Sequence, residues 1–267
     1  MSRYAGVSLR VEGLSKRFGG VTAVQGVSFS IPTGAIVAII GPNGAGKTTL
    51  FNLISGFHRP DQGHVYFDGK EITALAPEKI ASAGIVRTFQ IARLFNQITV
   101  LENVLVGFHL RTWGGVVSAL VGGKSLQQQE HGIREEAREL LSMVALDGVS
   151  ESLAGNLTGG QQRLLEIARA LAARPKLLML DEPAAGLNAP ETRQLLALIR
   201  CIRERGVTVL LVEHDMTLVM SVANQIHVLN FGERIASGSP EEIQTNPAVI
   251  EAYLGSGGSK RGSAGDV

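Results

Sequence analysis

The chain of 267 residues contains a single cysteine, Cys201, and this scarcity limits its chemistry at once. One cysteine cannot form an internal disulfide or a cysteine-rich zinc site, and the composition fits a reducing cytosol. The neighbouring Leu198, Ile199 and Ile202 are apolar. We therefore expect Cys201 to be an inert thiol in the core.

The sequence also lacks an excess of charge of either sign. It has 25 Lys and Arg against 24 Asp and Glu, which gives a formal net charge of +1. A dedicated nucleic-acid-binding protein normally carries a basic surplus, so we expect no nucleic-acid partner. Charged residues make up only 18% of the chain, and apolar residues make up 45%. This balance predicts either a surface that a partner protein covers or a large core.

No apolar run reaches the roughly 18 residues that a membrane helix needs. The longest candidates, Ala35–Ile40 and Val116–Val121, are much shorter. The first residues also lack the apolar core of a signal peptide. We therefore expect a protein without a membrane-spanning segment of its own.

Three runs that are apolar at nearly every position, residues 35–40, 177–180 and 207–212, are typical of strands covered on both faces. A helical pattern at 158–173 precedes the second run, and another at 190–205 precedes the third. Buried strands that alternate with helices predict a doubly wound α/β fold with a parallel sheet.

Other segments depart from this alternation. Residues 7–12 and 27–31 have the alternating pattern of half-buried strands, and Asp68-Gly69 predicts a hairpin turn between two short strands. Residues 99–146 are mainly helical in pattern. The sequence therefore predicts a small antiparallel sheet and an inserted helical block beside the parallel sheet. We find no internal repeat.

A glycine-rich segment follows the first buried strand and fits the phosphate-loop pattern G-x-x-x-x-G-K-[ST]. Its glycines let backbone N–H groups converge on phosphate oxygens, and the dipole of the next helix adds a favourable field. We expect Lys47 to reach the β- and γ-phosphates and Thr48 to ligate Mg²⁺. The alternative is an ordinary glycine turn. The predicted phosphate-binding residues are Gly41, Pro42, Asn43, Gly44, Ala45, Gly46, Lys47, Thr48 and Thr49.

Two acids, Asp181 and Glu182, follow the second buried strand. The carboxyl edge of an open α/β sheet is where such folds bind ligands. We expect Asp181 to hold Mg²⁺, directly or through water, and Glu182 to polarise the attacking water. Two acids after a strand can also simply begin a helix.

The segment Asn156-Leu-Thr158-Gly159-Gly160-Gln161 opens the helix before that strand. Thr158 and Gln161 form a capping-box pattern, and a well-capped helix is the simple interpretation. Capping alone requires neither glycine, whereas an anion bound at the helix start benefits from both. With these residues the sequence resembles the ABC ATPase family, whose signature is written L-S-G-G-Q. The resemblance extends from about Val7 to Leu254.

The resemblance implies further site residues. Phe18 matches the aromatic residue that stacks on adenine, and Gln90 matches the glutamine that senses Mg²⁺ and the attacking water. His214 matches the switch histidine at the γ-phosphate. Asn188 occupies a position where the family more often has Asp, so its hydrogen bonding across a dimer is in question.

The resemblance also implies domains and partners. Residues 7–255 would form one nucleotide-binding domain, with the helical subdomain at about 92–160. The composition of residues 256–267, rich in Gly and Ser, itself predicts a disordered tail. ATP and Mg²⁺ would be the cofactors, and Thr158–Gln161 would contact ATP held by a second cassette. Two separate permease subunits, and indirectly an extracytoplasmic solute-binding protein, would complete a transporter, with this chain peripheral at the cytoplasmic face of the membrane. The insert 107–129 could contact the permeases or belong to the helical subdomain.

Several segments resemble those of one subfamily. Its members are the larger ATP-binding subunits of bacterial importers for branched-chain (hydrophobic) amino acids. They include Val86-Arg-Thr-Phe-Gln90, Asp181-Glu-Pro-Ala-Ala-Gly-Leu-Asn188 and Ala252-Tyr-Leu-Gly255. Importers of urea or short amides share much of this pattern. Importers of that subfamily usually pair two different cassettes, although a homodimer is the alternative. Two alternatives come from other classes of protein. One is a soluble ABC ATPase that acts on ribosomes or DNA, and the other is a simple phosphate-loop kinase.

Overall fold

The computed structural model describes residues 6–88, 94–108 and 124–255. The chain divides into two compact units. The first unit contains residues 1–76 and 210–267, and the second contains residues 77–209. The predicted Gln90, most of the insert 107–129 and the tail 256–267 lie outside the described residues.

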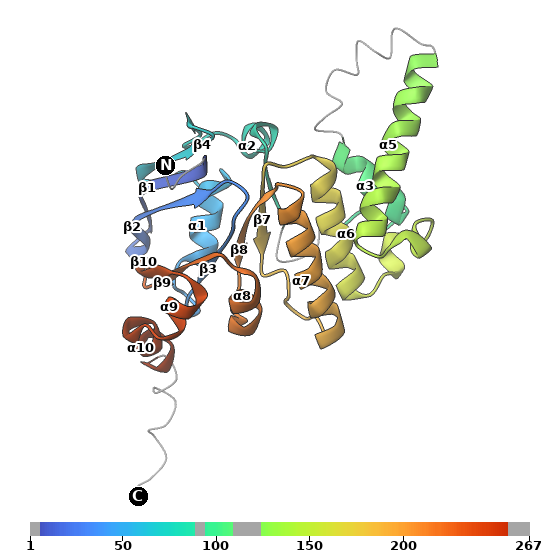
Figure 1. The fold of residues 1–267 in the computed structure, drawn as a ribbon. Coiled ribbons are helices and arrows are strands. Elements are labelled where there is room, and N and C mark those ends of the chain that lie inside the picture. The colour runs from blue at the N-terminus through green and yellow to red at the C-terminus, as the bar shows by residue number, and fades with distance from the viewer. Residues whose placement is uncertain (1–5, 89–93, 109–123, 256–267) are drawn as a thin grey trace, which may run out of the picture. The chain divides into compact units, whose positions relative to one another are not determined.

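The first unit contains the small antiparallel sheet that the alternating segments predict (Figure 1). Its strand order is β2-β1-β4-β5. Asp68 and Gly69 form the turn between the last two strands, with φ angles of 47° and 75°, as an Asp-Gly hairpin requires. The strands are β1 (Val7–Phe18), β2 (Val21–Pro32), β4 (Gln62–Phe67) and β5 (Lys70–Glu71).

Strands β1 and β2 are longer than the alternating pattern predicts, with 12 residues each. Their pairing shifts register between Val11 and Leu14 and again before Arg17. Gly13 and Gly26 lie in these irregular stretches with positive φ angles. Such bulges interrupt the alternation without ending the pairing. As a result β1 continues to Phe18, the predicted adenine-stacking residue.

The first unit also contains strands of the larger sheet, as predicted. Strand β3 (Ile36–Ile40) is buried at all five positions and pairs in parallel with β9 (Gln225–Asn230). Strand β10 (Glu233–Gly238) pairs antiparallel with β9. Strand β8 (Thr208–Val212), also fully buried, begins in the second unit and ends in the first. The helices of this unit are α1 (Lys47–Ile54), α8 (Met216–Val222), α9 (Pro240–Gln244) and α10 (Pro247–Gly255).

The second unit combines a parallel strand pair with the predicted helical block. Strand β6 (Ile85–Arg87) pairs with β7 (Leu177–Asp181), and β7 is buried throughout. Helices α3, α5 and α6 contact one another. The helices are α2 (Pro77–Ala83), α3 (Val100–Gly107), α5 (Lys124–Met143), α6 (Gly159–Ala172) and α7 (Ala189–Glu204), with 3₁₀ turns η2 (Asp147–Val149) and η3 (Ala154–Asn156).

The prediction for Cys201 is wrong in one respect, because this residue is only half-buried. Helix α7 buries Leu195, Leu198, Ile199 and Ile202, which form one stripe along the helix. Consecutive residues of a helix project in different directions, so Cys201, the neighbour of Ile202 in the sequence, falls at the edge of that stripe. Among the described residues, no helix is long and apolar enough to cross a membrane.

Candidate nucleotide-binding site

The glycine-rich loop connects β3 to α1 in the first unit, where the sequence places it. Lys47, the first residue of α1, is buried, and its ammonium donates hydrogen bonds to the carbonyl oxygens of Gly41 (2.7 Å) and Pro42 (3.0 Å). The N-cap residue Gly46 has no side chain to cap the helix. The first N–H groups of α1 therefore receive no side-chain cap, which is the arrangement that binds phosphate.

Two glycines of the loop approach other backbone segments so closely that no side chain would fit. A Cβ atom on Gly41 would overlap the carbonyl oxygen of Leu229, and one on Gly46 would overlap that of Ala23. The amide of Gly232 also donates to the carbonyl of Ala45, at 3.0 Å. The loop is thus fixed from β2 and from the β9–β10 turn, so its shape is built into the fold.

The end of the loop is open to a ligand. Thr48 is exposed, and Thr49 is half-buried in the first turn of α1. A lysine, a hydroxyl and uncapped helix amides together suit the charged oxygens of a polyphosphate. The loop geometry therefore agrees with the predicted phosphate site.

Phe18 ends strand β1 and is 44% exposed. Its ring meets the ring of His58 edge-on at a centroid distance of 5.3 Å. The ammonium of Lys16 lies 5.6 Å from the Phe18 centroid and is also paired with Asp61 at 2.7 Å. Much of the aromatic ring is therefore accessible for stacking, and it is held at its edge.

His214 follows β8 in the first unit, as predicted, with a side chain that is 60% exposed. Its backbone amide donates to the carboxylate of Glu213 at 3.1 Å. The side chain of Glu213 is fully buried, and Asp215 caps helix α8 by accepting from Leu218. The peptide of His214 is thus held on both sides, while its largely exposed imidazole has Nδ1 3.8 Å from the Glu213 carboxylate.

Asp181 and Glu182 lie at the end of β7 in the second unit. Asp181 is buried, and its Oδ2 accepts a hydrogen bond of 2.7 Å from Nη2 of Arg87. Glu182 is half-buried and has a φ angle of +46°, a conformation that a residue with a Cβ seldom adopts. Backbone strain of this kind is concentrated at functional sites. The role of Arg87 is not evident from the sequence, because Arg87 and Asp181 are 94 residues apart.

The predicted capping box at the start of α6 is confirmed. The hydroxyl of Thr158 accepts from the amide of Gln161 (3.3 Å), and the side chain of Gln161 accepts from the amide of Thr158 (3.0 Å). These two bonds use the amides at either side of Gly159 and Gly160. The amides of the two glycines lie in the first helical turn, where an intrahelical partner is lacking by geometry. The helix start can therefore present two N–H groups to an anion.

Asn188, where the family more often has Asp, is the N-cap of α7. Its side chain accepts from the amide of Glu191 at 3.0 Å, and its own amide donates to the Glu191 carboxylate at 2.9 Å. An aspartate would accept the same bond, so Asn188 retains the local capping role of the commoner residue.

The predicted residues are thus distributed over the two units. The first unit contains Phe18, the loop 41–49 and His214, and the second contains Asp181, Glu182 and the α6 start. Within the first unit, β3 and β8 are joined where the amide of Glu213 donates to the carbonyl of Ile39 at 3.4 Å. Gln90 lies outside the described residues.

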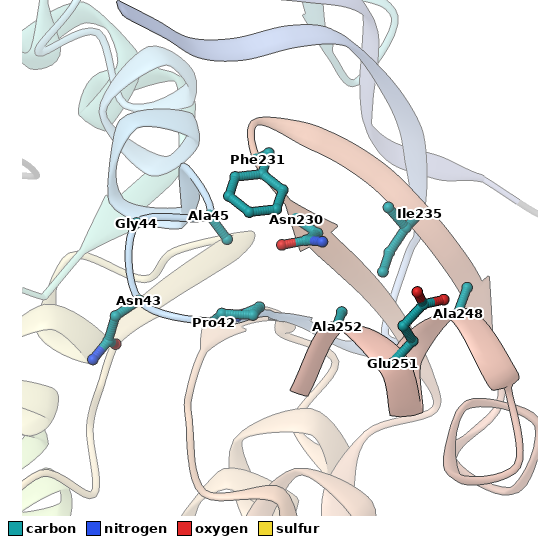
Figure 2. Close-up of a pocket in the computed structure, with 10 residues that line it drawn as sticks. All are labelled: Pro42, Asn43, Gly44, Ala45, Asn230, Phe231, Ile235, Ala248, Glu251 and Ala252. Atoms are coloured by element: carbon teal, nitrogen blue, oxygen red, sulfur yellow. The ribbon is translucent and has the colours of Figure 1, made fainter. Parts of the chain in front are cut away.

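A pocket of about 620 Å³ borders the loop on one side (Figure 2). In Figure 2 helix α10 contributes Ala248, Glu251 and Ala252, and the β9–β10 turn contributes Phe231 above the loop. The lining includes Pro42, Asn43, Gly44 and Ala45 of the predicted phosphate loop, but not Lys47, Thr48 or Phe18.

The neighbouring Tyr253 connects helix α10 to the beginning of the loop. Burial raises the pKa of its phenol, and the nearby backbone of Gly41 acts in the opposite direction. The C-terminal helix therefore supports the loop, which the sequence did not suggest.

No group of three His, Cys, Asp or Glu side chains in residues 6–88, 94–108 and 124–255 could hold a metal ion by itself. Proteins usually bind Mg²⁺ through one or two carboxylates together with substrate phosphates. The carboxylate of Asp181 and the exposed hydroxyl of Thr48 are donors of this kind. Each residue, considered in its own unit, fits a Mg²⁺–nucleotide ligand.

Comparison with known families accounts for these features together. A family model described as "ABC transporter" matches residues 24–185, more than half of the chain. The chain belongs to the ABC transporter family. A second model, described as "Branched-chain amino acid ATP-binding cassette transporter", matches residues 233–259 of this ABC cassette. That segment contains α9 together with β10 and α10, which both contribute residues to the loop pocket.

Individual relatives of known family support the same assignment. The cassette is 49% identical over 248 residues to the high-affinity branched-chain amino acid transport ATP-binding protein BraF of Pseudomonas aeruginosa, covering 92% of this chain and 97% of that protein. The ADP conformation of MJ1267, an ATP-binding cassette of an ABC transporter, has a TM-score of 0.81 and 34% identity, and the match covers 94% of this chain and all of that one. The dimeric, post-hydrolysis cassette MJ0796, bound to ADP and Pi, has a TM-score of 0.72 and 27% identity, with 87% and 98% coverage.

These findings confirm the predicted fold class and enzyme class. The cassette has the α/β fold of ABC ATPases, and it is an ATP-binding ATPase subunit of a transporter. Cassettes of this family form dimers, and a transporter requires membrane permeases.

Proposed function

We propose that this cassette powers the uptake of branched-chain or other hydrophobic amino acids through separate permease subunits. The observation that carries the proposal is the 49% identity to BraF along nearly the whole of both chains. The match of residues 233–259 to the branched-chain amino acid cassette model supports it independently of the nucleotide-binding motifs.

The residue roles that we propose follow from the geometry of each unit. Lys47 exchanges its loop carbonyl partners for the β- and γ-phosphates, and the α1 amides bind phosphate oxygens. Phe18 stacks on the adenine base through its accessible ring. His214, with its exposed imidazole on a fixed peptide, contacts the γ-phosphate.

At the β7 end, Glu182 polarises the attacking water as general base. Bound Mg²⁺ would neutralise charge on the phosphates, and Thr48, Asp181 and Gln90 would hold it. The assigned roles of Asp181 and Glu182 rest on their place at the end of a buried strand and on the strained backbone of Glu182. Gln90 is assigned from sequence resemblance alone.

The α6 start, Thr158–Gln161, closes the nucleotide site of a second cassette. Its capping box leaves the amides of Gly159 and Gly160 to face the γ-phosphate held by the partner. The partner is a different, smaller cassette or a second copy of this chain. Residues 7–255 form the nucleotide-binding domain, with the helical subdomain at about 92–160. Two permeases anchor the dimer at the cytoplasmic face of the membrane, and an extracytoplasmic binding protein delivers the solute.

Reconstitution tests the proposed substrate. The cassette is assembled with its permeases and binding protein in lipid vesicles, and ATP hydrolysis is measured with each solute. Leucine, isoleucine and valine should stimulate hydrolysis, and Glu182→Gln should abolish the stimulated rate. Stimulation by urea or short amides instead would assign the machinery to that solute class. Hydrolysis that no added permease or solute changes would contradict the transport role.

A further inference from the structure

A buried ion pair connects Asp181, the metal-binding acid of the proposed site, to Arg87, a residue without an assigned role. Arg87 is the last residue of β6, and Asp181 is the last residue of β7. The two strands are parallel neighbours, so both side chains lie at the same edge of the sheet. Their Nη2–Oδ2 distance is 2.7 Å, and the side chains are only 7% and 6% exposed.

Stability alone does not explain such a pair. Burying two charges costs desolvation free energy that their attraction repays only with good geometry, and apolar residues often serve stability equally well. The pair does, however, control the charge and the orientation of the carboxylate. Arg87 offers a rigid planar fork, and its bond to Oδ2 fixes the rotation of Asp181 while Oδ1 lies outside this bond.

The backbone around Arg87 is equally well fixed. The amide of Thr88 donates to the carbonyl of Met179 at 2.9 Å, which continues the β6–β7 pairing beyond Arg87. Thr88 is almost completely buried. Arg87 therefore cannot move away from Asp181 without a change in its side-chain rotamer or in the sheet edge.

We propose that Arg87 is a positioning residue that holds Asp181 and neutralises it, so that a divalent cation binds there only together with a polyphosphate. The inference rests on the proposed role of Asp181 in binding Mg²⁺. A single carboxylate that shares its charge with a guanidinium attracts a free cation weakly, because the local net charge is close to zero. The negative charge of the nucleotide supplies the missing attraction.

The test measures cation binding without nucleotide, using Mn²⁺ as the probe and the full chain. Binding is followed by the loss of the electron paramagnetic resonance signal of free Mn²⁺ and by the thermal unfolding midpoint. Arg87→Met leaves Asp181 as an uncompensated acid, so the variant should bind Mn²⁺ at least about tenfold more tightly than the native chain. Mn²⁺ should also raise its unfolding midpoint, with little effect on that of the native chain.

Loss of a buried arginine can prevent folding, and two further variants keep the inference falsifiable. Arg87→Gln is neutral but retains an N–H donor for Asp181, and it should bind Mn²⁺ as tightly as Arg87→Met. Arg163→Met removes the arginine of another buried pair, Arg163–Glu166 at 3.2 Å in the same unit. It should be destabilised without any gain in Mn²⁺ affinity.

The outcomes separate this inference from the proposed function. Native-like Mn²⁺ affinity in both Arg87→Gln and Arg87→Met, or in whichever of them folds, would overturn the role of Arg87. A gain that persists in Arg87→Gln combined with Asp181→Asn would also overturn it, because the cation would then bind elsewhere. If Asp181→Asn alone leaves Mn²⁺–ATP binding unchanged, the metal-binding role of Asp181 itself fails.

Discussion

The carboxylate of Glu191 lies against the α-carbon of Gly160, so the first turn of α7 contacts the first turn of α6. Glu191 is held there because its carboxylate accepts from the amide of Asn188 at 2.9 Å. A Cβ atom added to Gly160 would overlap this carboxylate, whereas a Cβ atom on Gly159 would meet open space. The two signature glycines therefore differ in what they tolerate.

We expect Gly160→Ala to displace Glu191 and to break the capping box of α7. The loss of a helix cap should lower the free energy of unfolding by about 1–2 kcal/mol. ATP turnover should fall as well, because the α6 start is the predicted contact to the partner's nucleotide. Urea unfolding and phosphate release measure the two effects.

Gly159→Ala is the matched control and should leave stability nearly unchanged. Combining Gly160→Ala with Glu191→Ala removes the obstructing carboxylate, so the double variant should lose less stability than the two single changes added together. Equal stability of Gly159→Ala and Gly160→Ala would contradict the steric explanation.

Glu182→Gln should retain ATP binding and lose turnover by about 10²–10³, the usual cost of removing one group that stabilises a transition state. The amide cannot accept a proton from the attacking water. ATP should then accumulate unhydrolysed and keep cassettes paired, which analytical ultracentrifugation would detect as a dimer. Glu204→Gln, at an exposed position on α7, serves as the control. Steady-state turnover in Glu182→Gln at the native rate would refute the assigned role.

Phe18→Ala should weaken ATP binding by about tenfold, because stacking of a base on an aromatic ring contributes on the order of 1–3 kcal/mol. Phe18→Tyr keeps the ring and should bind nearly as well as the native chain. Phe57, which is similarly exposed at 46%, provides Phe57→Ala as a control for loss of an exposed ring. Isothermal titration with ATP compares the three variants. Equal affinities in the two alanine variants would show that Phe18 does not stack on adenine.

His227 should make the first unit sensitive to acid. Burial, with a smaller contribution from Arg234, lowers its pKa from 6.5 to about 4. Its ring packs on Phe29, and both ring nitrogens are buried without a hydrogen-bond partner among the described residues. The native state thus resists protonation, while the unfolded chain takes up a proton below pH 6.5.

The sign of the effect follows from this difference. Stability should be highest above pH 6.5 and should fall as the pH decreases toward 4, by roughly 3 kcal/mol at most. Urea unfolding at pH 7.5, 6 and 5 would measure the slope. His227→Leu removes the titrating ring and should flatten the slope over this window. An unchanged slope in that variant would assign the acid sensitivity to other groups.

Much of this fold is encoded in local patterns that can be recognised from the sequence. Strands β3, β7 and β8 are buried on both faces and therefore appear as continuous apolar runs. The caps of α6 and the Asp68-Gly69 turn each depend on residues within a few positions of one another.

The features that could not be predicted depend on distant segments. The pairing of Arg87 with Asp181 requires β6 to lie beside β7, and the contact of Glu191 with Gly160 requires α7 to meet α6. The bulges that extend β1 to Phe18 break the alternation on which strand prediction relies.

The central claim is that one chain carries only part of an ATP site, and mixing two inactive variants tests it most directly. Lys47→Ala disables the phosphate loop and keeps the α6 start. Replacing Gly159 and Gly160 by bulky residues disables the α6 start and keeps the phosphate loop. Each variant alone should be inactive, and an equimolar mixture should regain at most about a quarter of the native ATPase rate through mixed dimers. A variant with bulky residues at 159 and 160 that sediments as a monomer and still hydrolyses ATP at the native rate would contradict the account.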